Sequence, residues 1–479
     1  MIMYKFKNYK FSILLGLGLA VVSCKAPAIE PTKASPAMPE SFVNGKDTNT
    51  IAATPWKNFY KDKNLADLID IALKNNQELL ITLQEIEIAK NDIRVKKGAL
   101  LPMVGVKAGA GVEKVGRYTS QGAGDASTEI MPGKEFPDPL QDYTLAAYAH
   151  WEVDIWKKLR NSKKAAVSRY LATVEGKNFV ITNLVAEVAD SYYELVSLDS
   201  QLEIVRQNIN LQTNALEIVK VQKEAARATE LAVQKFQAEV YSSKSMEFEI
   251  LQRIKETENT INFLLGRYPQ EIPRDKTNFL SLMPNSVTSG IPSQLLANRP
   301  DIKQAELELA AAKLDVKSAR AEFYPSLDIS ASYGLQAFNP SYLFTLPESL
   351  LYSLAGDLAA PLINRNAIKA EYKNANARQL QALYNYERTI LNAYLEVATQ
   401  LSKISNLENS YNLKSKQVDA LNKSIDVSND LFKSARVDYF EVLMTQRDAL
   451  ESKLELIETK KEQLNATVHI YRNLGGGWK

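Results

Sequence analysis

The chain has 479 residues, of which 45% are hydrophobic and 24% charged, and its formal net charge is +2. These values are ordinary for a folded chain, so they exclude wholesale disorder, and the balanced charge gives no sign of a nucleic-acid partner. One cysteine and two histidines that lie far apart in sequence exclude an internal disulfide and argue against a metal site or a metal cofactor.

The first residues predict an export signal. Lysines at positions 5, 7 and 10 precede an apolar stretch over 11–22, which is too short to span a bilayer comfortably. The only cysteine, Cys24, follows directly, as it does in a bacterial lipobox, where signal removal leaves a cysteine for lipid attachment. We therefore predict a signal peptide over 1–23 and lipidation at Cys24; a chance cysteine behind an ordinary signal is the alternative.

Residues 24–55 follow as the lipidated N-terminus and its connection to the body of the protein. This segment is rich in proline, alanine, threonine and serine. Such a composition is typical of an extended, flexible tether.

Two very long stretches predict coiled-coil helices. The stretch 362–474 contains neither glycine nor proline over about 113 residues, and 157–265 is interrupted only by Gly176. Ordinary helices are far shorter, so runs of this length indicate coiled coils or helical repeats. Apolar residues near the C-terminus also recur every seven positions, at Leu443, Leu450, Ile457, Leu464 and Tyr471. A sustained seven-residue repeat is typical of a left-handed coiled coil.

Each long stretch must fold back once. The sequence predicts the turns at 226–229 and 435–438, because Thr229 and Asp438 are suitable N-caps for the returning helices. The outgoing helices then contain about 70 residues and the returning ones about half as many. Shorter helices predicted over 64–99 and 300–323 would pack on the rest of each long helix.

Alternation of apolar and polar residues predicts four strands. They cover 103–115, 142–154, 327–338 and 350–360. Each is about ten residues long, which suits a tilted membrane strand with one apolar and one polar face. A soluble sheet with one wet face fits the alternation equally well, and the export signal favours the membrane. His150 is predicted on the polar face, facing a lumen or hydrogen-bonded rather than binding a ligand.

From Tyr143 and Tyr352 onward the two halves of the chain align at a constant offset of 209 residues, and their earlier parts match at a different offset, as Pro102 and Pro325 show. This pattern predicts an internal duplication. The first repeat is 56–266 and the second is 300–479, each with a helix, two strands and a long helix hairpin, and 267–299 connects them.

Four strands are too few for a barrel of their own. Open sheet edges are not tolerated in lipid, and single-chain barrels begin at about eight strands. We therefore predict that several copies combine their strands in one barrel.

Together these features resemble the TolC-like outer membrane factors, in particular the lipoprotein branch that serves resistance-nodulation-division (RND) efflux pumps. The order and spacing of several short stretches carry the resemblance over nearly the whole mature chain. They include Leu100–Pro102, Trp151–Trp156, Leu264–Arg267, Leu295–Ile302, Phe323–Ser326, Asp438–Leu443 and Leu474–Trp478.

The resemblance implies a membrane α+β fold. Three copies would form a 12-stranded outer-membrane β-barrel, continued by a long periplasmic α-helical coiled-coil barrel. The protein would be the outer membrane channel of a tripartite efflux pump in a Gram-negative bacterium. It would passively conduct small toxic compounds, in contact with outer membrane lipid, a periplasmic adaptor and an inner-membrane RND pump, and it would need no cofactor.

The resemblance also implies a gate at the periplasmic turns. The candidate gate residues are Arg436, Asp438 and Glu441, and the candidate adaptor contacts are Arg227 and Arg436. For any one of them, helix capping or a solvated surface charge is the alternative. The family normally has glycine at these turns, where this chain has Ala226 and Ala435.

Three other functions remain to be weighed against efflux. The outer membrane conduit of a type I protein secretion system would have the same architecture. A coiled-coil surface lipoprotein used for adhesion would explain the anchor and the heptads, but not four strands placed symmetrically within a duplication. An enzyme is disfavoured, because the sequence contains no nucleophile–base arrangement, metal-ligand spacing or phosphate-binding loop.

Overall fold

The computed structural model describes residues 38–42, 48–276, 279–363, 365–434 and 436–479. The predicted signal peptide and Cys24 lie outside these residues. Two compact units emerge, and several helices run through both. The described part of the first unit is Glu87–Tyr170 with Leu307–Leu383, and the second contains residues 38–86, Leu171–Glu306 and Tyr384–Lys479.

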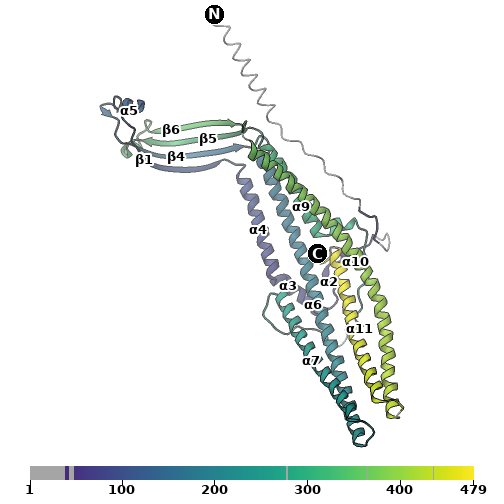
Figure 1. Cartoon of the computed structure of the whole chain (residues 1–479). Coiled ribbons are helices and arrows are strands. Elements are labelled where there is room, and N and C mark those ends of the chain that lie inside the picture. The colour runs from purple at the N-terminus through teal and green to yellow at the C-terminus, as the bar shows by residue number, and fades with distance from the viewer. Residues whose placement is uncertain (1–37, 43–47, 277–278, 364, 435) are drawn as a thin grey trace. The chain divides into compact units, whose positions relative to one another are not determined.

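The first unit is built on an antiparallel sheet of four strands, as the alternation predicted (Figure 1). The strands are β1 (Met103–Glu113), β4 (Leu140–Val153), β5 (Ser326–Ala337) and β6 (Leu350–Ala359). Their order is β1-β4-β5-β6, so β1 and β6 are the edges. The observed bounds lie within about two residues of the predicted ones.

The loop that joins β1 to β4 contains structure that alternation alone did not predict. It holds α5 (Ser120–Asp125) and a two-stranded ribbon of β2 (Glu129–Met131) and β3 (Lys134–Glu135). The shorter loop between β5 and β6 contains the 3₁₀ turn η3 (Pro340–Tyr342). Elements this short carry too few residues for a periodic signal.

Four helices join the ends of these strands. They are α4 (Gln77–Gly98), α6 (Lys158–Glu224), α9 (Pro300–Ala321) and α10 (Asn366–Lys433). Helix α4 precedes β1 and α9 precedes β5, whereas α6 follows β4 and α10 follows β6. In the first unit Ala319 of α9 and Phe323, two residues beyond the end of α9, pack on Tyr372 of α10, and the Phe323 and Tyr372 rings meet edge to face at 5.6 Å.

The second unit is helical. The returning helices α7 (Glu230–Leu264) and α11 (Tyr439–Asn473) pack on α6 and α10, together with α2 (Trp56–Phe59), α3 (Lys63–Asn75) and α8 (Gln294–Asn298). Two 3₁₀ turns, η1 (Ile51–Ala53) and η2 (Phe279–Ser281), complete it. No helix among the described residues combines the length and apolarity needed to cross a bilayer.

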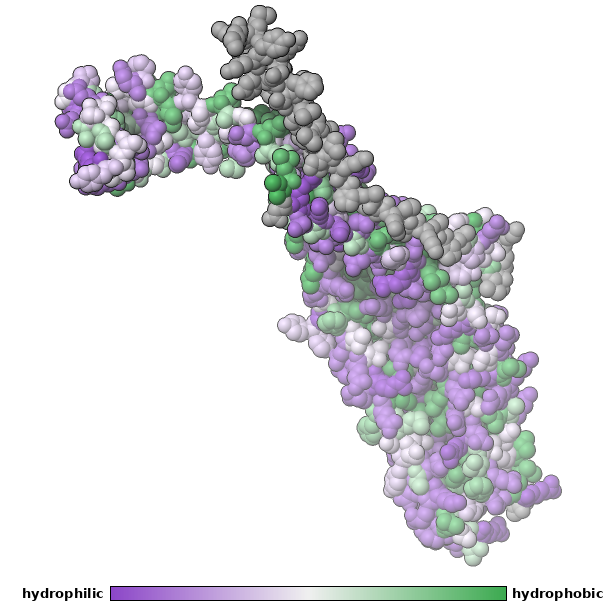
Figure 2. Space-filling view, turned by 45° about the horizontal axis from the view of Figure 1, so that its top comes forward, coloured by the Kyte–Doolittle hydropathy of each residue, from purple (hydrophilic) through white to green (hydrophobic). Residues whose placement is uncertain are grey.

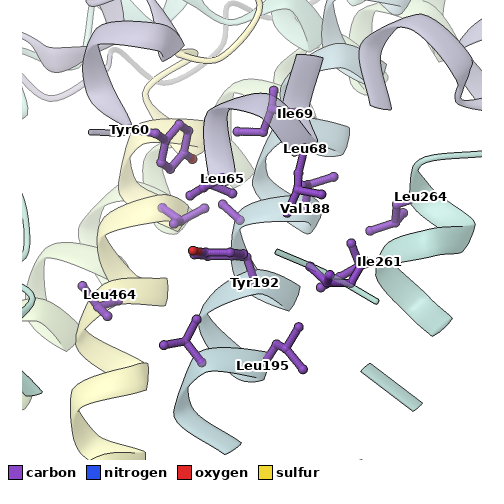
Figure 3. Close-up of a cluster of buried hydrophobic side chains, with 14 of the residues drawn as sticks. Tyr60, Leu65, Leu68, Ile69, Val188, Tyr192, Leu195, Ile261, Leu264 and Leu464 are labelled. Carbon is purple, nitrogen blue, oxygen red and sulfur yellow. The ribbon is translucent and has the colours of Figure 1, made fainter. Parts of the chain in front are cut away.

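A hydrophobic cluster between α3, α6, α7 and α11 forms the main core of this unit (Figure 3). Tyr192 on α6 lies at its centre, and its hydroxyl donates a hydrogen bond of 2.6 Å to Oδ2 of Asp62. Asp62 in turn caps α3, because its other carboxylate oxygen accepts from the Asn64 N–H. The polar tip of the buried tyrosine is thereby paired, as burial requires.

The helix predicted over 64–99 is wrong in one respect, because it is two helices. The chain leaves the helical conformation at Asn76, with ψ of 125°, and resumes it as α4. The Asn76 side chain accepts a hydrogen bond from the Leu79 N–H and donates one to the Leu264 carbonyl, each at 3.0 Å. Asparagine competes well for such local bonds, and here it caps α4 and binds the end of α7.

The flexible tether predicted over 24–55 is also too long, because its last part is folded onto the second unit. Phe42 is buried and its ring stacks on Tyr394 of α10 at 5.5 Å. Thr50 forms a β-bridge with Ser289, and Ala52 is fully buried. A few apolar residues within a proline-rich segment suffice to bind it to a core, because each buries surface.

Candidate functional site

The register of the sheet divides its residues into two contrasting faces. On β1 and β6 the apolar face consists of the even-numbered residues, beginning at Val104 and Leu350. On β4 and β5 it consists of the odd-numbered residues, beginning at Tyr143 and Leu327. Direct cross-strand partners, such as Ala147 and Tyr333, fall on the same face throughout. No charged residue lies on the apolar face, which is the pattern of a strand surface that meets lipid.

This apolar face is not buried within the chain. Val106, Tyr352 and Leu354 expose 76%, 76% and 80% of their surface. Figure 2 shows apolar residues, in green, at the surface of the sheet. A contiguous exposed apolar surface of this kind marks a protein or membrane contact.

The opposite, polar face carries hydrogen-bonding side chains. Ser332 and Ser353 bond across β5 and β6 at 2.7 Å, and the Gln336 amide donates to Asp142 at 2.8 Å. His150 lies on the polar face, as predicted, with Nε2 3.7 Å from Asp328. The polar face therefore suits contact with water.

The sheet ends in two unsatisfied edges. Among the described residues β1 pairs only with β4, and β6 pairs only with β5. The outer backbone groups of both strands thus find no strand partner within the described part of the chain. In lipid each unpaired backbone N–H or C=O group would cost roughly several kcal/mol. Both edges of the sheet therefore need further strands to pair with.

The two turns between the long helices and the returning helices form the second candidate region, and they belong to the second unit. Thr229 caps α7 by accepting a hydrogen bond from the Ala232 N–H at 3.3 Å, and Asp438 caps α11 by accepting from the Phe440 N–H at 2.6 Å. Both predicted N-caps are confirmed. Ala226 adopts the left-handed conformation with φ of 55°, which explains why glycine would be favoured at this position.

The predicted gate residues are placed close together by the second turn but do not bind one another. Asp438 is the N-cap of α11 and Glu441 lies in its first turn, while the Arg436 backbone N–H closes the end of α10 on Leu431. Among the described residues no ion pair joins Arg436, Asp438 and Glu441. At the first turn the Arg227 backbone N–H donates a hydrogen bond to the Gln222 carbonyl, and its side chain forms no ion pair with any residue that the structure describes.

Two contacts near the turns were not predicted from the sequence. Lys223 and Glu230 form an ion pair between α6 and α7, and this lysine with the Gln234 amide lowers the pKa of Glu230. Lys235 of α7 also places its ammonium 5.1 Å from the ring centre of Phe440 on α11. The second contact joins the two hairpins, and no spacing in the sequence could have revealed it, because the residues are about 200 positions apart.

The chain matches the family model described as outer membrane efflux protein, over residues 68–267 and 291–476. It is 28% identical over 425 residues to the pyoverdine export outer membrane protein OpmQ of Pseudomonas aeruginosa, covering 88% of this chain and 87% of that protein. It is 26% identical over 472 residues to the cation efflux system protein CusC of Escherichia coli, covering 97% and 98%.

A crystal structure of a membrane protein from Pseudomonas aeruginosa is similar in fold. The TM-score is 0.83 at 26% identity, and the match covers 94% of this chain and 99% of that one. Sequence and fold similarity therefore extend over nearly the full length of the chain.

Proposed function

The chain belongs to the outer membrane efflux protein family, and from this premise we propose that three copies assemble into one continuous channel. Family membership makes the protein the outer-membrane component of an efflux pump and not an enzyme. The proposed channel conducts small compounds passively from the periplasm to the exterior. Its cargo is selected by the inner-membrane pump, since similar proteins are named for cargoes as different as pyoverdine and cations.

The amphipathic sheet with two free edges is the observation that carries this proposal. Pairing β6 of one copy with β1 of the next closes the sheet, satisfies both edges and turns every apolar face outward to lipid. Three copies contribute twelve strands, which exceeds the minimum of about eight for a membrane barrel. The number three comes from the resemblance to TolC-like factors, and the internal duplication gives each copy two similar strand pairs.

The helices supply the periplasmic part of the proposed channel. In each copy α6 and α10 have 67 and 68 residues, which corresponds to roughly 100 Å each. A periplasmic adaptor docks on the turns of this helical barrel, with Arg227 and Arg436 as contacts. An RND-type pump of the inner membrane delivers cargo behind it.

The experiment that tests the channel combines mass and conductance. Light scattering in mild detergent is expected to give a protein mass of roughly three times 53.5 kDa, and the same sample is expected to form discrete conducting pores in planar bilayers. A monomer that leaves the bilayer silent would disprove the proposal. Deletion of the gene should also sensitise cells to toxic compounds, whereas a type I secretion conduit would instead retain an exported protein.

Lipidation at Cys24 is the proposed anchor of each copy. Attached acyl chains add membrane affinity of about 0.8 kcal/mol per buried methylene. Cells fed labelled palmitate should label the natural chain but not Cys24→Ser. Equal labelling of both chains would show that lipid is attached elsewhere.

The gate is proposed at the second turn, where Arg436, Asp438 and Glu441 of one copy bind a neighbouring copy. Exposed ion pairs contribute only about 0–1 kcal/mol each, so adaptor binding suffices to open such a latch. Arg436→Ala with Asp438→Asn removes two charges while asparagine retains the N-cap, and single-channel conductance should rise. The matched control is Asp430→Ala with Lys433→Ala, an exposed ion pair one turn earlier. Equal conductance of both double variants would remove these residues from the gate.

A further inference from the structure

We infer that the end of the sheet where strands meet helices carries a basic collar that binds the anionic headgroups of phospholipids. The inference rests on the proposed channel, which places this end of the barrel at the periplasmic leaflet of the outer membrane. Six cations form the basic collar of each copy. They are Arg94, Lys96 and Lys97 of α4, and Lys157, Lys163 and Lys164 at the start of α6.

The chain brings these cations to one end of the sheet. Because β1 pairs antiparallel with β4, Met103 at the start of β1 lies opposite His150 near the end of β4. Helix α4 therefore arrives where α6 departs (Figure 1). The Trp151 indole N–H also donates a hydrogen bond of 3.1 Å to the Leu100 carbonyl, which joins the two connections. The six cations thus belong to one region of the first unit.

The charges of the basic collar are available to an external anion. None of the six forms an ion pair with any residue that the structure describes. Five of them are exposed, and Lys163 is half-buried. Two neighbouring cations differ, since Lys158 pairs with Glu152 and Arg160 pairs with Asp154.

The two ends of the sheet differ in charge. Around the junctions of strands and helices, basic side chains outnumber acidic ones by 17 to five, counted over 90–102, 154–170, 313–325 and 360–378. At the opposite end, the loops over 114–139 and 338–349 contain three basic and five acidic side chains. A chain whose total charge is nearly balanced therefore places its excess of cations at the helical end. Clusters of lysine and arginine beside a membrane attract anionic lipid.

Positive charge recurs at matched positions in the second half of the chain. Arg94 corresponds to Lys317 of α9 at the earlier of the two repeat offsets, and Lys164 corresponds to Lys373 of α10 at the offset of 209. All four side chains are exposed. Packing within the chain therefore does not account for the retained charge.

The lysines at the start of α6 are placed against local preference. Lys157 adopts the left-handed conformation with φ of 63°, where glycine is favoured because it lacks a Cβ atom. The first turn of α6 also contains no acid, although positive charge is unfavourable at the N-terminus of a helix. Such strain persists mainly where a function requires the residue. A bound lipid phosphate supplies this requirement, because both the lysines and the positive end of the helix attract it.

The basic collar has the right depth for headgroups. The headgroup layer is about 5–8 Å thick on each side of the hydrocarbon core, and Lys157 to Lys164 spans about 10 Å of helix. Lysine side chains also extend toward the interface from either side. Trp156, which directly precedes the collar, is 46% exposed and stacks on Tyr324 at 4.8 Å. Exposed aromatic side chains are typical of the boundary between hydrocarbon and headgroups.

Quenching of tryptophan fluorescence by brominated lipid tests the inference. The full-length protein is reconstituted in phosphatidylcholine vesicles with increasing fractions of either brominated phosphatidylglycerol or brominated phosphatidylcholine. The ratio of the two binding constants measures the preference for the anionic lipid. The natural chain should prefer phosphatidylglycerol, and raising the salt from about 0.05 M to about 0.5 M should weaken this preference by screening.

Removal of three collar charges should abolish most of the preference. Lys157→Gly with Lys163→Gln and Lys164→Gln is expected to lower it at least fivefold, since a single lysine near an anionic surface contributes roughly that factor. Lys157→Arg with Lys163→Arg and Lys164→Arg keeps the charges and should keep the preference.

A matched control removes the same charge from the second unit. The control is the triple variant Lys244→Gln, Lys416→Gln and Lys423→Gln, at three exposed lysines, and its preference should equal that of the natural chain. Lys157→Gly alone gives a second readout. It should raise the midpoint of thermal unfolding in detergent by roughly 1–2 °C, because the strain is relieved, and yet lower the lipid preference. A merely structural role of Lys157 would change the midpoint alone.

The outcomes separate the collar from the channel. Equal binding of both lipids by a natural chain that is trimeric and forms pores would overturn the basic collar while the channel stands. If the glutamine variant of the collar keeps its lipid preference but changes the ion selectivity of the pore, these lysines face the lumen and the collar is likewise overturned. A monomer without pores would overturn both.

Discussion

At the scale of single residues, Arg274 shows how the segment between the two halves is fixed. Its guanidinium is almost fully buried and binds Asp199 of α6 through two hydrogen bonds, of 2.5 and 3.1 Å. A third bond of 2.9 Å reaches Glu258 of α7. One side chain from the connecting segment 267–299 thus joins both helices of the first hairpin. Its own buried charge is paired with the two carboxylates.

Removing Arg274 should therefore destabilise the second unit strongly. Arg274→Met keeps the volume but leaves the buried carboxylate of Asp199 without this cation and Glu258 with only Lys255, 3.5 Å away, at a cost of about 3–5 kcal/mol. The midpoint of thermal unfolding, followed by far-ultraviolet circular dichroism in detergent, is expected to fall markedly. Lys57→Met, which breaks an exposed ion pair with Asp70, should change it little. If both variants melt alike, the Arg274 network contributes little to stability.

At the scale of elements, the start of α6 illustrates how a strand becomes a helix. Asp154 directly follows β4 and accepts hydrogen bonds of 2.9 Å from the backbone N–H groups of Leu159 and Arg160. The Arg160 guanidinium adds another of 2.9 Å. Burial by itself would raise the pKa of Asp154, but these bonds outweigh it and hold the pKa below its usual value.

This shift predicts an acid-sensitive helix start. Because the folded pKa of Asp154 is lowered, its contribution is present above the unfolded pKa of about 3.9 and is lost as the pH falls through the folded value. The natural protein should lose melting temperature more steeply below about pH 4 than Asp154→Asn, which still accepts hydrogen bonds but carries no charge. Asp67→Asn, at an exposed site on α3, is the control and should follow the natural curve.

The ends of the returning helices show a second regularity at this scale. Asn76 binds the carbonyl of Leu264 at the end of α7, and Arg299 binds the carbonyl of Asn473 at the end of α11. These carbonyls are 209 residues apart, the same offset that underlies the proposed duplication. The two junctions differ in charge, since Arg299 also pairs with Asp301 and Glu396.

At the scale of the whole molecule, the two faces of the sheet suit different surroundings, lipid on the apolar face and water on the polar face. Neighbouring residues on one strand should therefore respond oppositely to the same substitution. Leu354→Arg places a charge on the apolar face and should cost about 2–4 kcal/mol per copy near the bilayer midplane. The amount of the proposed trimer recovered from outer membranes should fall accordingly.

Ala355→Arg is the matched control for this prediction. Ala355 is the next residue of β6 and lies on the polar face, opposite Ser330. Its arginine remains in water, so the yield of trimer should be close to that of the natural chain. Equal losses for both variants would contradict the assignment of lipid and water to the two faces.

The sequence by itself determined the elements of this protein. Period-two alternation located four strands, the absence of glycine and proline located the long helices, and the N-caps Thr229 and Asp438 located their turns. These are local signals, because they depend on backbone propensity and on which face of an element is apolar. The break at Asn76 was not predicted, because only one of its two hydrogen bonds, the cap on the Leu79 N–H, is local, and the other binds a carbonyl nearly 190 residues away.

Only the tertiary structure decided how these elements meet. The strand order is β1-β4-β5-β6, Phe42 stacks on Tyr394, and Arg274 binds Asp199. Each of these contacts joins residues that are remote in sequence. A single sequence specifies which surfaces are apolar but not which pairs of them come together. That choice depends on packing and pairing between distant segments, and it alone shows that β1 and β6 are the edges of the sheet.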